Sequence, residues 1–163
     1  MNTTLDLKNK STLYSYIDVR LKGLIDGVPY ALANLANTSA LLYELLPDIN
    51  WAGFYFVKND QLILGPFQGK TACVRINIGC GVCGTASAED QPIVVKDVHQ
   101  FPGHIACDSA SRSEIVIPLH LDNKVIGVLD IDSPILNRFD EDDLEGLLKV
   151  THLLEQQVLP LND

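Results

Sequence analysis

Four cysteines are the residues of this chain whose type and spacing best suit chemistry, and Cys107 has the most reactive setting. It stands in the long irregular stretch 97–113, near His104 and Ser109 and shortly before an apolar strand. A structural cysteine sits more naturally inside a strand, because a buried thiol behaves as a small hydrophobic group. A loop thiol with polar neighbours suits a nucleophile, since reactivity follows thiolate content and exposure. Position alone leaves the two readings of Cys107 about even.

Two further cysteines could act as partners of an oxidised thiol. Cys73 ends a loop at the edge of a strand, and Cys83 lies in a glycine-rich turn. A second thiol within reach converts a sulfenic acid to a disulfide, which another thiol can reduce. The alternative is a core thiol packed at a helix start, and this alternative is stronger for Cys83 than for Cys73.

Cys80 and Cys83 form a Cys-x-x-Cys pair. This spacing occurs in redox motifs and in half-sites for zinc. A structural zinc site usually combines two close pairs. The other two cysteines, Cys73 and Cys107, lie far apart in the chain, so we predict no metal site.

Three carboxylates fall where they can meet. Asp130 and Asp132 are two residues apart at the end of an apolar strand, so they point to the same face of a sheet. Glu114 begins the neighbouring strand. A solvated strand end is the simpler reading of the pair, but a cluster of three acids can bind an ammonium group. It can also keep one acid protonated, because crowded carboxylates raise one another's pKa.

Two aromatic residues share one side of the first strand. Trp51 and Tyr55 alternate with Gly53 between them. Plain core packing is the usual fate of strand aromatics. The alternative is the wall of a pocket whose ligand packs an apolar end on the rings.

Hydrophobic periodicity predicts the elements that carry these residues. Helices are expected over 12–26, 29–46 and 85–89 and from 140 onward, and strands over 49–57, 61–66, 74–78, 93–95, 114–120 and 124–132. In the second helix, Leu32, Leu35, Leu42 and Leu46 are expected to share the buried face. Acidic residues 140–143 suit the positive end of the last helix. Hairpin-joined strands indicate an α+β fold with a largely antiparallel sheet and the helices collected on one face.

Composition narrows the class of protein. The 163 residues suit one domain, 1–163, in which we expect 1–11 to be loosely ordered, and 47% are hydrophobic, enough for a real core. The net charge of −9 argues against nucleic acid and against an anionic membrane surface as partners. No signal peptide and no membrane-spanning run is recognisable, so we expect a cytoplasmic protein with reduced thiols.

Several motifs together resemble one known family. They are NWAGFY (50–55), LGPFQGKTAC (64–73), GVCGTA (81–86), DVH (97–99), GHIACD (103–108), SEIV (113–116) and IGVLDID (126–132). These segments are similar to those of the free methionine-(R)-sulfoxide reductases, which are built on a GAF domain. The resemblance covers residues 31–154. Cys80 departs from it, because the family more often carries Lys or Arg there.

The resemblance implies a fold, a reaction and roles. The fold is a GAF-like antiparallel sheet of about six strands with the N-terminal and C-terminal helices packed on it. The reaction is thiol-dependent reduction of free methionine (R)-sulfoxide, with no cofactor and with thioredoxin as reductant. The implied catalytic cysteines are the nucleophile Cys107, the resolving Cys73 and a third, secondary Cys83. The acidic pocket is Glu114, Asp130 and Asp132, and its aromatic wall is Trp51 and Tyr55.

Within that reaction we expect the three acids to have different roles. We expect Glu114 and Asp132 to protonate the sulfoxide oxygen, one of them held protonated by the other, and Asp130 to take the substrate ammonium. The alternative function is a non-catalytic GAF domain that binds a small ligand as a sensor, since a fold alone does not fix function. A homodimer through the N-terminal helices is a further, open suggestion.

Overall fold

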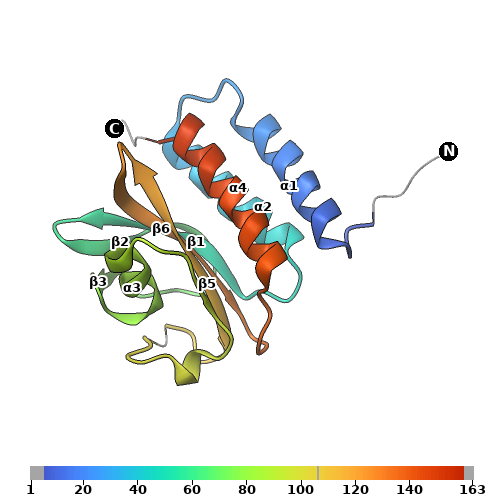
Figure 1. Ribbon diagram of the computed structural model, residues 1–163. Helices are drawn as coiled ribbons and strands as arrows, with labels where there is room; N and C mark the ends of the chain where they lie inside the picture. Colours follow the sequence, from blue (N-terminus) through green and yellow to red (C-terminus); the bar gives the residue numbers. More distant parts are fainter. Residues whose placement is uncertain (1–5, 106, 160–163) are drawn as a thin grey trace.

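A six-stranded antiparallel sheet is the centre of the structure, a computed structural model that describes residues 6–105 and 107–159 (Figure 1). The strands are β1 (Trp51–Lys58), β2 (Gln61–Gly69), β3 (Arg75–Asn77), β4 (Ile93–Val95), β5 (Ser113–Leu121) and β6 (Lys124–Ser133). The helices are α1 (Lys10–Ile25), α2 (Ala31–Leu45), α3 (Gly81–Glu89) and α4 (Glu141–Gln157), with a short 3₁₀ helix η1 (Val98–Gln100). The strand order is β3-β2-β1-β6-β5-β4. The sequence prediction of an α+β fold with about six antiparallel strands is confirmed.

Alternation along β1 divides the core into two parts, one on each face of the sheet. Ala52 and Phe54 join the larger cluster, which also contains the buried faces of α1, α2 and α4. Trp51 and Tyr55 point the other way, into a smaller cluster with Val116 and Val128. The two faces of this strand are therefore as predicted, because a period of two places successive side chains on opposite faces.

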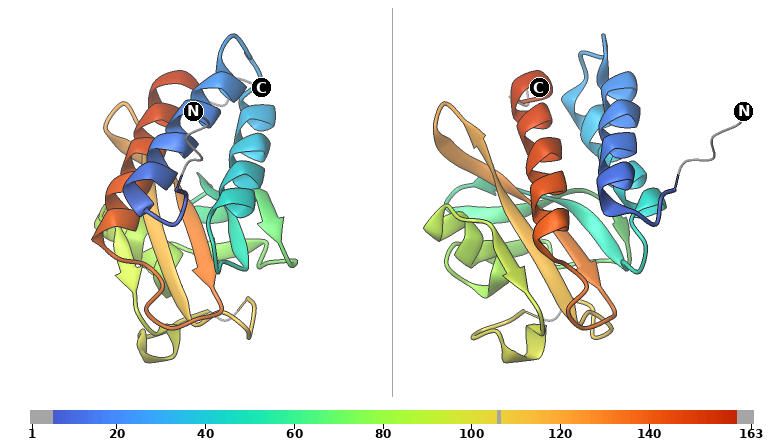
Figure 2. Two further views of the ribbon diagram at one scale, coloured as in Figure 1. Left: turned by 90° about the vertical axis from the view of Figure 1, so that its right-hand side faces the viewer. Right: turned by 45° about the vertical axis from the view of Figure 1, so that its right-hand side comes forward.

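Helices α1, α2 and α4 lie on one face of the sheet (Figure 2). Helix α2 packs on β1 and β2, α4 packs on β5, and α1 packs against α2 and α4. The N-terminal and C-terminal helices therefore lie where the prediction placed them. The expectation that all helices share this face is wrong for α3, which packs on β5 and β6 from the opposite face through residues such as Val82 and Cys83.

Two other details differ from the sequence prediction. Helix α3 begins at Gly81, four residues earlier than expected. In α2, Leu32 is exposed, whereas Thr38 and Ser39 are buried. These hydroxyls can enter the core because each donates a hydrogen bond to a carbonyl one turn earlier, Thr38 to Asn34 and Ser39 to Leu35.

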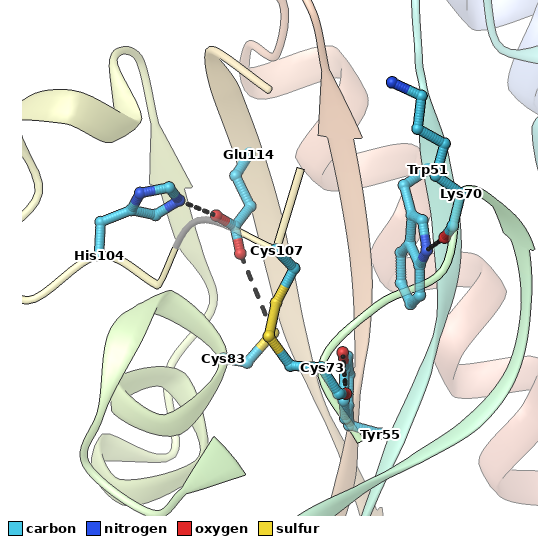
Figure 3. The surroundings of a disulfide bond; sticks show 8 residues. All are labelled: Trp51, Tyr55, Lys70, Cys73, Cys83, His104, Cys107 and Glu114. Atoms are coloured by element: carbon cyan, nitrogen blue, oxygen red, sulfur yellow. Dashed lines mark hydrogen bonds and ion pairs between the residues drawn. A yellow bond between two sulfur atoms is a disulfide. The ribbon is translucent and has the colours of Figure 1, made fainter. Parts of the chain in front are cut away.

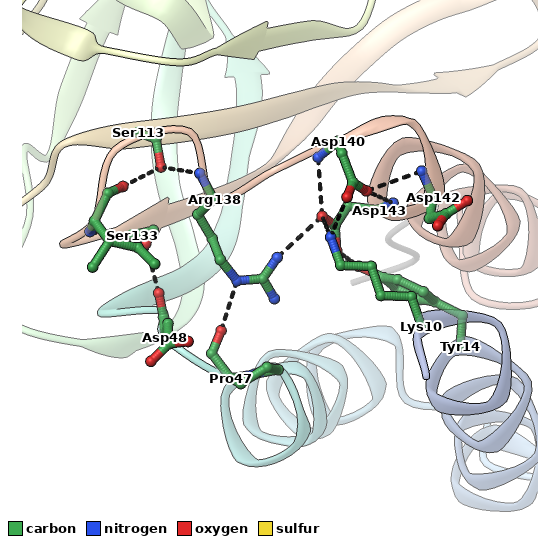
Figure 4. Close-up of polar contacts among 11 residues, drawn as sticks. Lys10, Tyr14, Pro47, Asp48, Ser113, Ser133, Arg138, Asp140, Asp142 and Asp143 are labelled. Carbon is green, nitrogen blue, oxygen red and sulfur yellow. Dashed lines mark hydrogen bonds and ion pairs between the residues drawn. The ribbon is translucent and has the colours of Figure 1, made fainter. Parts of the chain in front are cut away.

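The first turn of α4 ties the helices together (Figure 4). Asp140 caps the helix, and its side chain accepts from the backbone N–H of Asp143 while Asp143 accepts from that of Asp140. Asp143 is 1% exposed and also accepts hydrogen bonds from Tyr14 and Lys10 of α1 and from Arg138. The acidic helix start that the sequence indicated thus also anchors α1 to α4.

The single domain 1–163 stays a prediction, and residues 1–5 and 160–163 lie outside the described residues. Of the segment 1–11 that was expected to be loosely ordered, Lys10 and Ser11 belong to helix α1, which Asn9 caps. Among the residues that the structure describes, no helix combines the length and the hydropathy needed to cross a bilayer.

Candidate active site

Strand register builds one row of site residues across three strands. Glu114 of β5 is the direct partner of Asp132 of β6, and Asp132 is the direct partner of Trp51 of β1. In the next row on the same face, Asp130 lies between Val116 and Gly53. Since partners in adjacent strands project to the same side, the sheet brings the three predicted acids together on the face that carries α3.

Burial and crowding make this acid cluster unusual. Glu114 and Asp130 are each 6% exposed, and Asp132 is half-buried. Burial raises the pKa of Glu114 well above its ordinary value, and the charges of Asp130 and Asp132 raise it further. Burial raises the pKa of Asp130 to about 6. Burial, followed by the charges of Asp130 and Asp108, raises the pKa of Asp132. The cluster therefore holds protons at pH values where ordinary carboxylic acids are ionised.

One oxygen of the cluster is unpartnered. Among the described residues, Oδ1 of Asp130 is buried and accepts no hydrogen bond. A buried carboxylate oxygen without a donor is costly. Because Asp130 lines the pocket described below, a donor such as an ammonium group could satisfy this oxygen.

Trp51 and Tyr55 form the aromatic wall. The Trp51 ring stacks between Phe67, with centroids 5.2 Å apart, and Tyr55, with centroids 5.9 Å apart. A Cβ at Gly53 would overlap the Phe67 side chain and lie 2.7 Å from the Trp51 ring, so the wall needs glycine at this position. The indole N–H of Trp51 holds the loop before β3, because Nε1 donates to the Lys70 carbonyl at 3.1 Å.

Cys73 and Cys107 are joined by a disulfide, with their Cα atoms 5.7 Å apart (Figure 3). Cys107 is exposed and Cys73 is half-buried. The Tyr55 hydroxyl donates to the Cys73 carbonyl at 2.9 Å, which fixes one end of the bridge. The two cysteines that the resemblance pairs are therefore within bonding reach of each other.

Cys83 and Cys80 are free thiols with opposite surroundings. Cys83 is 4% exposed, and its Sγ lies 3.9 Å from Oε1 of Glu114 (Figure 3). Burial, together with the nearby Asp130 and Glu114 charges, raises the pKa of the Cys83 thiol well above its ordinary value. Cys83 is therefore a protonated, packed thiol beside the acids, whereas Cys80 is exposed.

The loop that leads to Cys107 supplies residues to which sequence reasoning gave no role. Nε2 of His104 lies 3.8 Å from Oε2 of Glu114, and burial lowers the pKa of His104, so the ring is neutral near pH 7 (Figure 3). Asp108 accepts hydrogen bonds from Asn50 at 3.1 Å and from the Ala110 backbone at 2.9 Å. The side chains of His104, Asp108 and Asn50 fall within the motifs quoted above, but their contacts become visible only once the loop is folded.

Most of these groups line one pocket, a narrow cavity of about 40 Å³ that opens to solvent. Seven of the eight predicted site residues line it, namely Trp51, Tyr55, Cys83, Cys107, Glu114, Asp130 and Asp132, and the eighth, Cys73, is bonded to Cys107. One atom each of Cys83, Glu114 and Asp130 lie within 4.8 Å of one another, close enough to surround a small cation. That no metal is used stays a prediction.

Comparison with known proteins identifies the family of this chain. The GAF domain family matches residues 21–158. The free methionine-R-sulfoxide reductase of Escherichia coli (strain K12) is 56% identical over 148 residues, which cover 91% of this chain and 90% of that protein. The chain belongs to the GAF-domain free methionine-R-sulfoxide reductases.

Solved structures agree with this family assignment. The fRMsr of Staphylococcus aureus in complex with substrate is 51% identical, with a TM-score of 0.85 over 90% of this chain and 95% of that chain. The free methionine-R-sulfoxide reductase of Neisseria meningitidis in complex with its substrate is 45% identical, with a TM-score of 0.89 over 92% of this chain and 90% of that chain. The prediction of an oxidoreductase of this family is confirmed, and the roles of individual residues are proposals.

Proposed function

We propose that this protein reduces free L-methionine (R)-sulfoxide to methionine through a sulfenic acid on Cys107 and a disulfide with Cys73. The observation that carries the proposal is the combination, in one pocket, of a reactive loop cysteine with buried acids that hold protons near neutral pH. A thiol alone attacks the sulfoxide sulfur but cannot release the oxygen. The acids supply the missing proton.

Substrate binding follows from charge and shape. Oδ1 of Asp130 is buried without a donor, so the substrate ammonium would satisfy it. The apolar end of the substrate would pack against the edge of Trp51, which lines the pocket while its ring stacks on Phe67 and Tyr55. A free amino acid has the ammonium group that this arrangement requires, whereas a methionine within a protein chain has an amide there. This supports a free substrate.

In the first chemical step, the Cys107 thiolate attacks the sulfoxide sulfur and forms a sulfur–sulfur bond, while Glu114, with Asp132, delivers a proton to the sulfoxide oxygen. The oxygen then moves to Sγ of Cys107 as the sulfur–oxygen bond of the substrate and the new sulfur–sulfur bond both break. Methionine leaves reduced by two electrons, and Cys107 is oxidised by two electrons to the sulfenic acid. His104, 3.8 Å from Glu114, can relay a proton from solvent to that acid, taking one up at one ring nitrogen and releasing one from the other.

In the second step, the Cys73 thiol attacks Sγ of the Cys107 sulfenic acid. A disulfide forms and water leaves. Bridging distance between these residues supports this step, with Cα atoms 5.7 Å apart. A dithiol then reduces the disulfide and restores both thiols, and we propose thioredoxin in the cytoplasm for this task. Cys83 supports the site as a packed thiol beside Glu114.

An assay coupled to NADPH, thioredoxin reductase and thioredoxin tests this function. Free (R)-sulfoxide, free (S)-sulfoxide and both epimers within a peptide are supplied separately. Turnover of the free (R) epimer alone is the expected result. Equal turnover of both free epimers, or preference for the peptide, would contradict the proposal. Tight binding of a cyclic nucleotide without any turnover would instead favour the sensor function.

A further inference from the structure

The proposed reaction gives Cys83 only a packing role and Cys80 none, although the two occupy the first turn of α3. Cys80 is the N-cap residue and is exposed, and Cys83 lies three residues later and is buried. The Gly84 backbone N–H donates to the Cys80 carbonyl at 3.0 Å, which closes this turn. In helical geometry, Cα atoms three residues apart are about 5 Å apart. That separation is within the range that a disulfide spans.

The loop that carries Cys107 packs directly on this turn. A Cβ at Gly81 would lie 3.2 Å from Cγ1 and Cδ1 of Ile105, and Gly81 has a φ of +62°, so glycine is needed on both counts. Cys80, Cys83 and Cys107 all line the same pocket. Two free thiols of α3 and one residue of the disulfide therefore line the same pocket.

Helix stability does not explain the cysteine at position 80. Preferred N-cap residues offer a side-chain oxygen to the free N–H groups of the first turn. Cys80 makes no such hydrogen bond. A thiol at this exposed position is therefore more useful as a reactant than as a cap.

We propose that Cys80 and Cys83 form a second redox couple, which takes the oxidising equivalent from the Cys73–Cys107 disulfide and presents it to the dithiol reductant. This inference rests on the proposed function for the origin of the disulfide. Sγ of Cys80, as thiolate, attacks Sγ of Cys107, and Cys73 leaves as a thiolate that takes up a proton. Sγ of Cys83 then attacks Sγ of Cys80, the bond between Cys80 and Cys107 breaks, and the Cys83 proton passes to the departing Cys107 sulfur.

The net change moves one disulfide without any other oxidant or reductant. Cys107 is free for the next substrate, and the oxidised pair now includes Cys80, which is exposed as Cys107 is. An incoming dithiol protein can then reduce the disulfide at Cys80 while Cys107 is already released from its disulfide.

Peptide mapping tests the transfer, because trypsin places the cysteines on three peptides, 71–75, 76–96 and 97–112. The reduced protein, freed of reductant, receives one equivalent of free methionine (R)-sulfoxide. A parallel sample receives one equivalent of diamide, which oxidises thiols directly. Disulfide exchange between the cysteines can then be measured even if the protein does not reduce the sulfoxide. Both samples are quenched with acid, alkylated and digested without reduction. In wild type we expect peptide 76–96 to accumulate with neither cysteine alkylated, and in Cys83→Ser a cross-link between 76–96 and 97–112.

Cys80→Ser is the matched control, because serine is a good N-cap and the fold is retained. In this variant, oxidation should stop at the disulfide that cross-links peptides 71–75 and 97–112. Thioredoxin should reduce this disulfide at roughly one fifth of the wild-type rate or less. The inference is overturned if Cys80 and Cys83 stay fully alkylated in wild type and Cys83→Ser under both oxidants. Absence of methionine in the first sample would overturn the proposed function separately, since the diamide sample still reads the exchange.

Discussion

Glu114 lies directly opposite Asp132 in the ladder between β5 and β6, and both carboxyl groups face the pocket that contains Cys107. Two carboxylic acids in such positions cannot both ionise without a large cost. The pair therefore retains a proton, and a retained proton is what reduction of a sulfoxide consumes.

Replacing Glu114 by Gln should keep the fold and remove the proton donor. An amide has nearly the same shape but cannot transfer the proton, so kcat for free methionine (R)-sulfoxide should fall about 100-fold or more. Stopped reactions with methionine quantified by chromatography would measure this, with circular dichroism as the check on folding. A fall of less than about threefold would mean that Glu114 is not the donor.

The buried acids should make the disulfide form more stable at mildly acidic pH than at neutral pH. Burial raises the pKa of Asp130 to about 6, whereas an unfolded chain releases this proton near 3.9. Between these values the native state binds more protons, so the free energy of unfolding falls as pH rises, by about 1.4 kcal/mol per pH unit for each such group. The raised pKa values of Glu114 and Asp132 extend the fall above pH 6.

Urea unfolding at pH 5 and pH 7.5 measures this fall. Asp130→Asn should reduce the difference between the two pH values. Asp140→Asn is the control, because the pKa of Asp140 is lowered rather than raised and asparagine caps a helix equally well. Greater stability of the wild type at pH 7.5 would show that the acids are not held protonated.

The hydroxyl of Tyr55 should position Cys73 rather than bind substrate. Tyr55→Phe leaves the ring but removes the donor to the Cys73 carbonyl, at a cost of about 1 kcal/mol. Disulfide formation after the first turnover should slow, while KM stays near its wild-type value. Tyr14→Phe removes a hydroxyl bound to Asp143, remote from the pocket, and should lower stability without slowing the disulfide. If Tyr55→Phe raises KM and leaves disulfide formation unchanged, the positioning role is wrong.

Cys73→Ser should separate the first turnover from the cycle. The variant should still form one methionine per chain, because Cys107 performs that step. Cycling with thioredoxin should fall about tenfold or more, since serine cannot condense with the sulfenic acid. Residual cycling should disappear in Cys73→Ser/Cys80→Ser. A Cys73→Ser protein that cycles at the wild-type rate would point to Cys83 or Cys80 as the resolving residue.

Features with a simple local period could be predicted from the sequence. Alternation placed Trp51 and Tyr55 on one side of β1, and the spacing of Asp130 and Asp132 placed both on one face. The neighbouring position of Glu114 followed from the order of the strands. Such local patterns survive folding because strand geometry alone fixes them.

Features that depend on long-range packing could not be predicted in this way. The short helix α3 is apolar without a clear stripe, so nothing in its sequence indicated the face of the sheet it covers. Leu32 was expected in the core, but the buried face of α2 uses Thr38 and Ser39, whose hydroxyls are satisfied by backbone carbonyls. The approach of His104 to Glu114 depends on the path of an irregular loop.

The most direct test of the account is a single-turnover experiment with Cys107→Ser. Reduced wild-type and variant proteins, freed of reductant, are mixed with excess free methionine (R)-sulfoxide, and the methionine formed per chain is measured. The account predicts a rapid burst of methionine from wild type and none from the variant, because only Cys107 attacks the sulfoxide sulfur. A burst from Cys107→Ser at the wild-type rate and amplitude would contradict it.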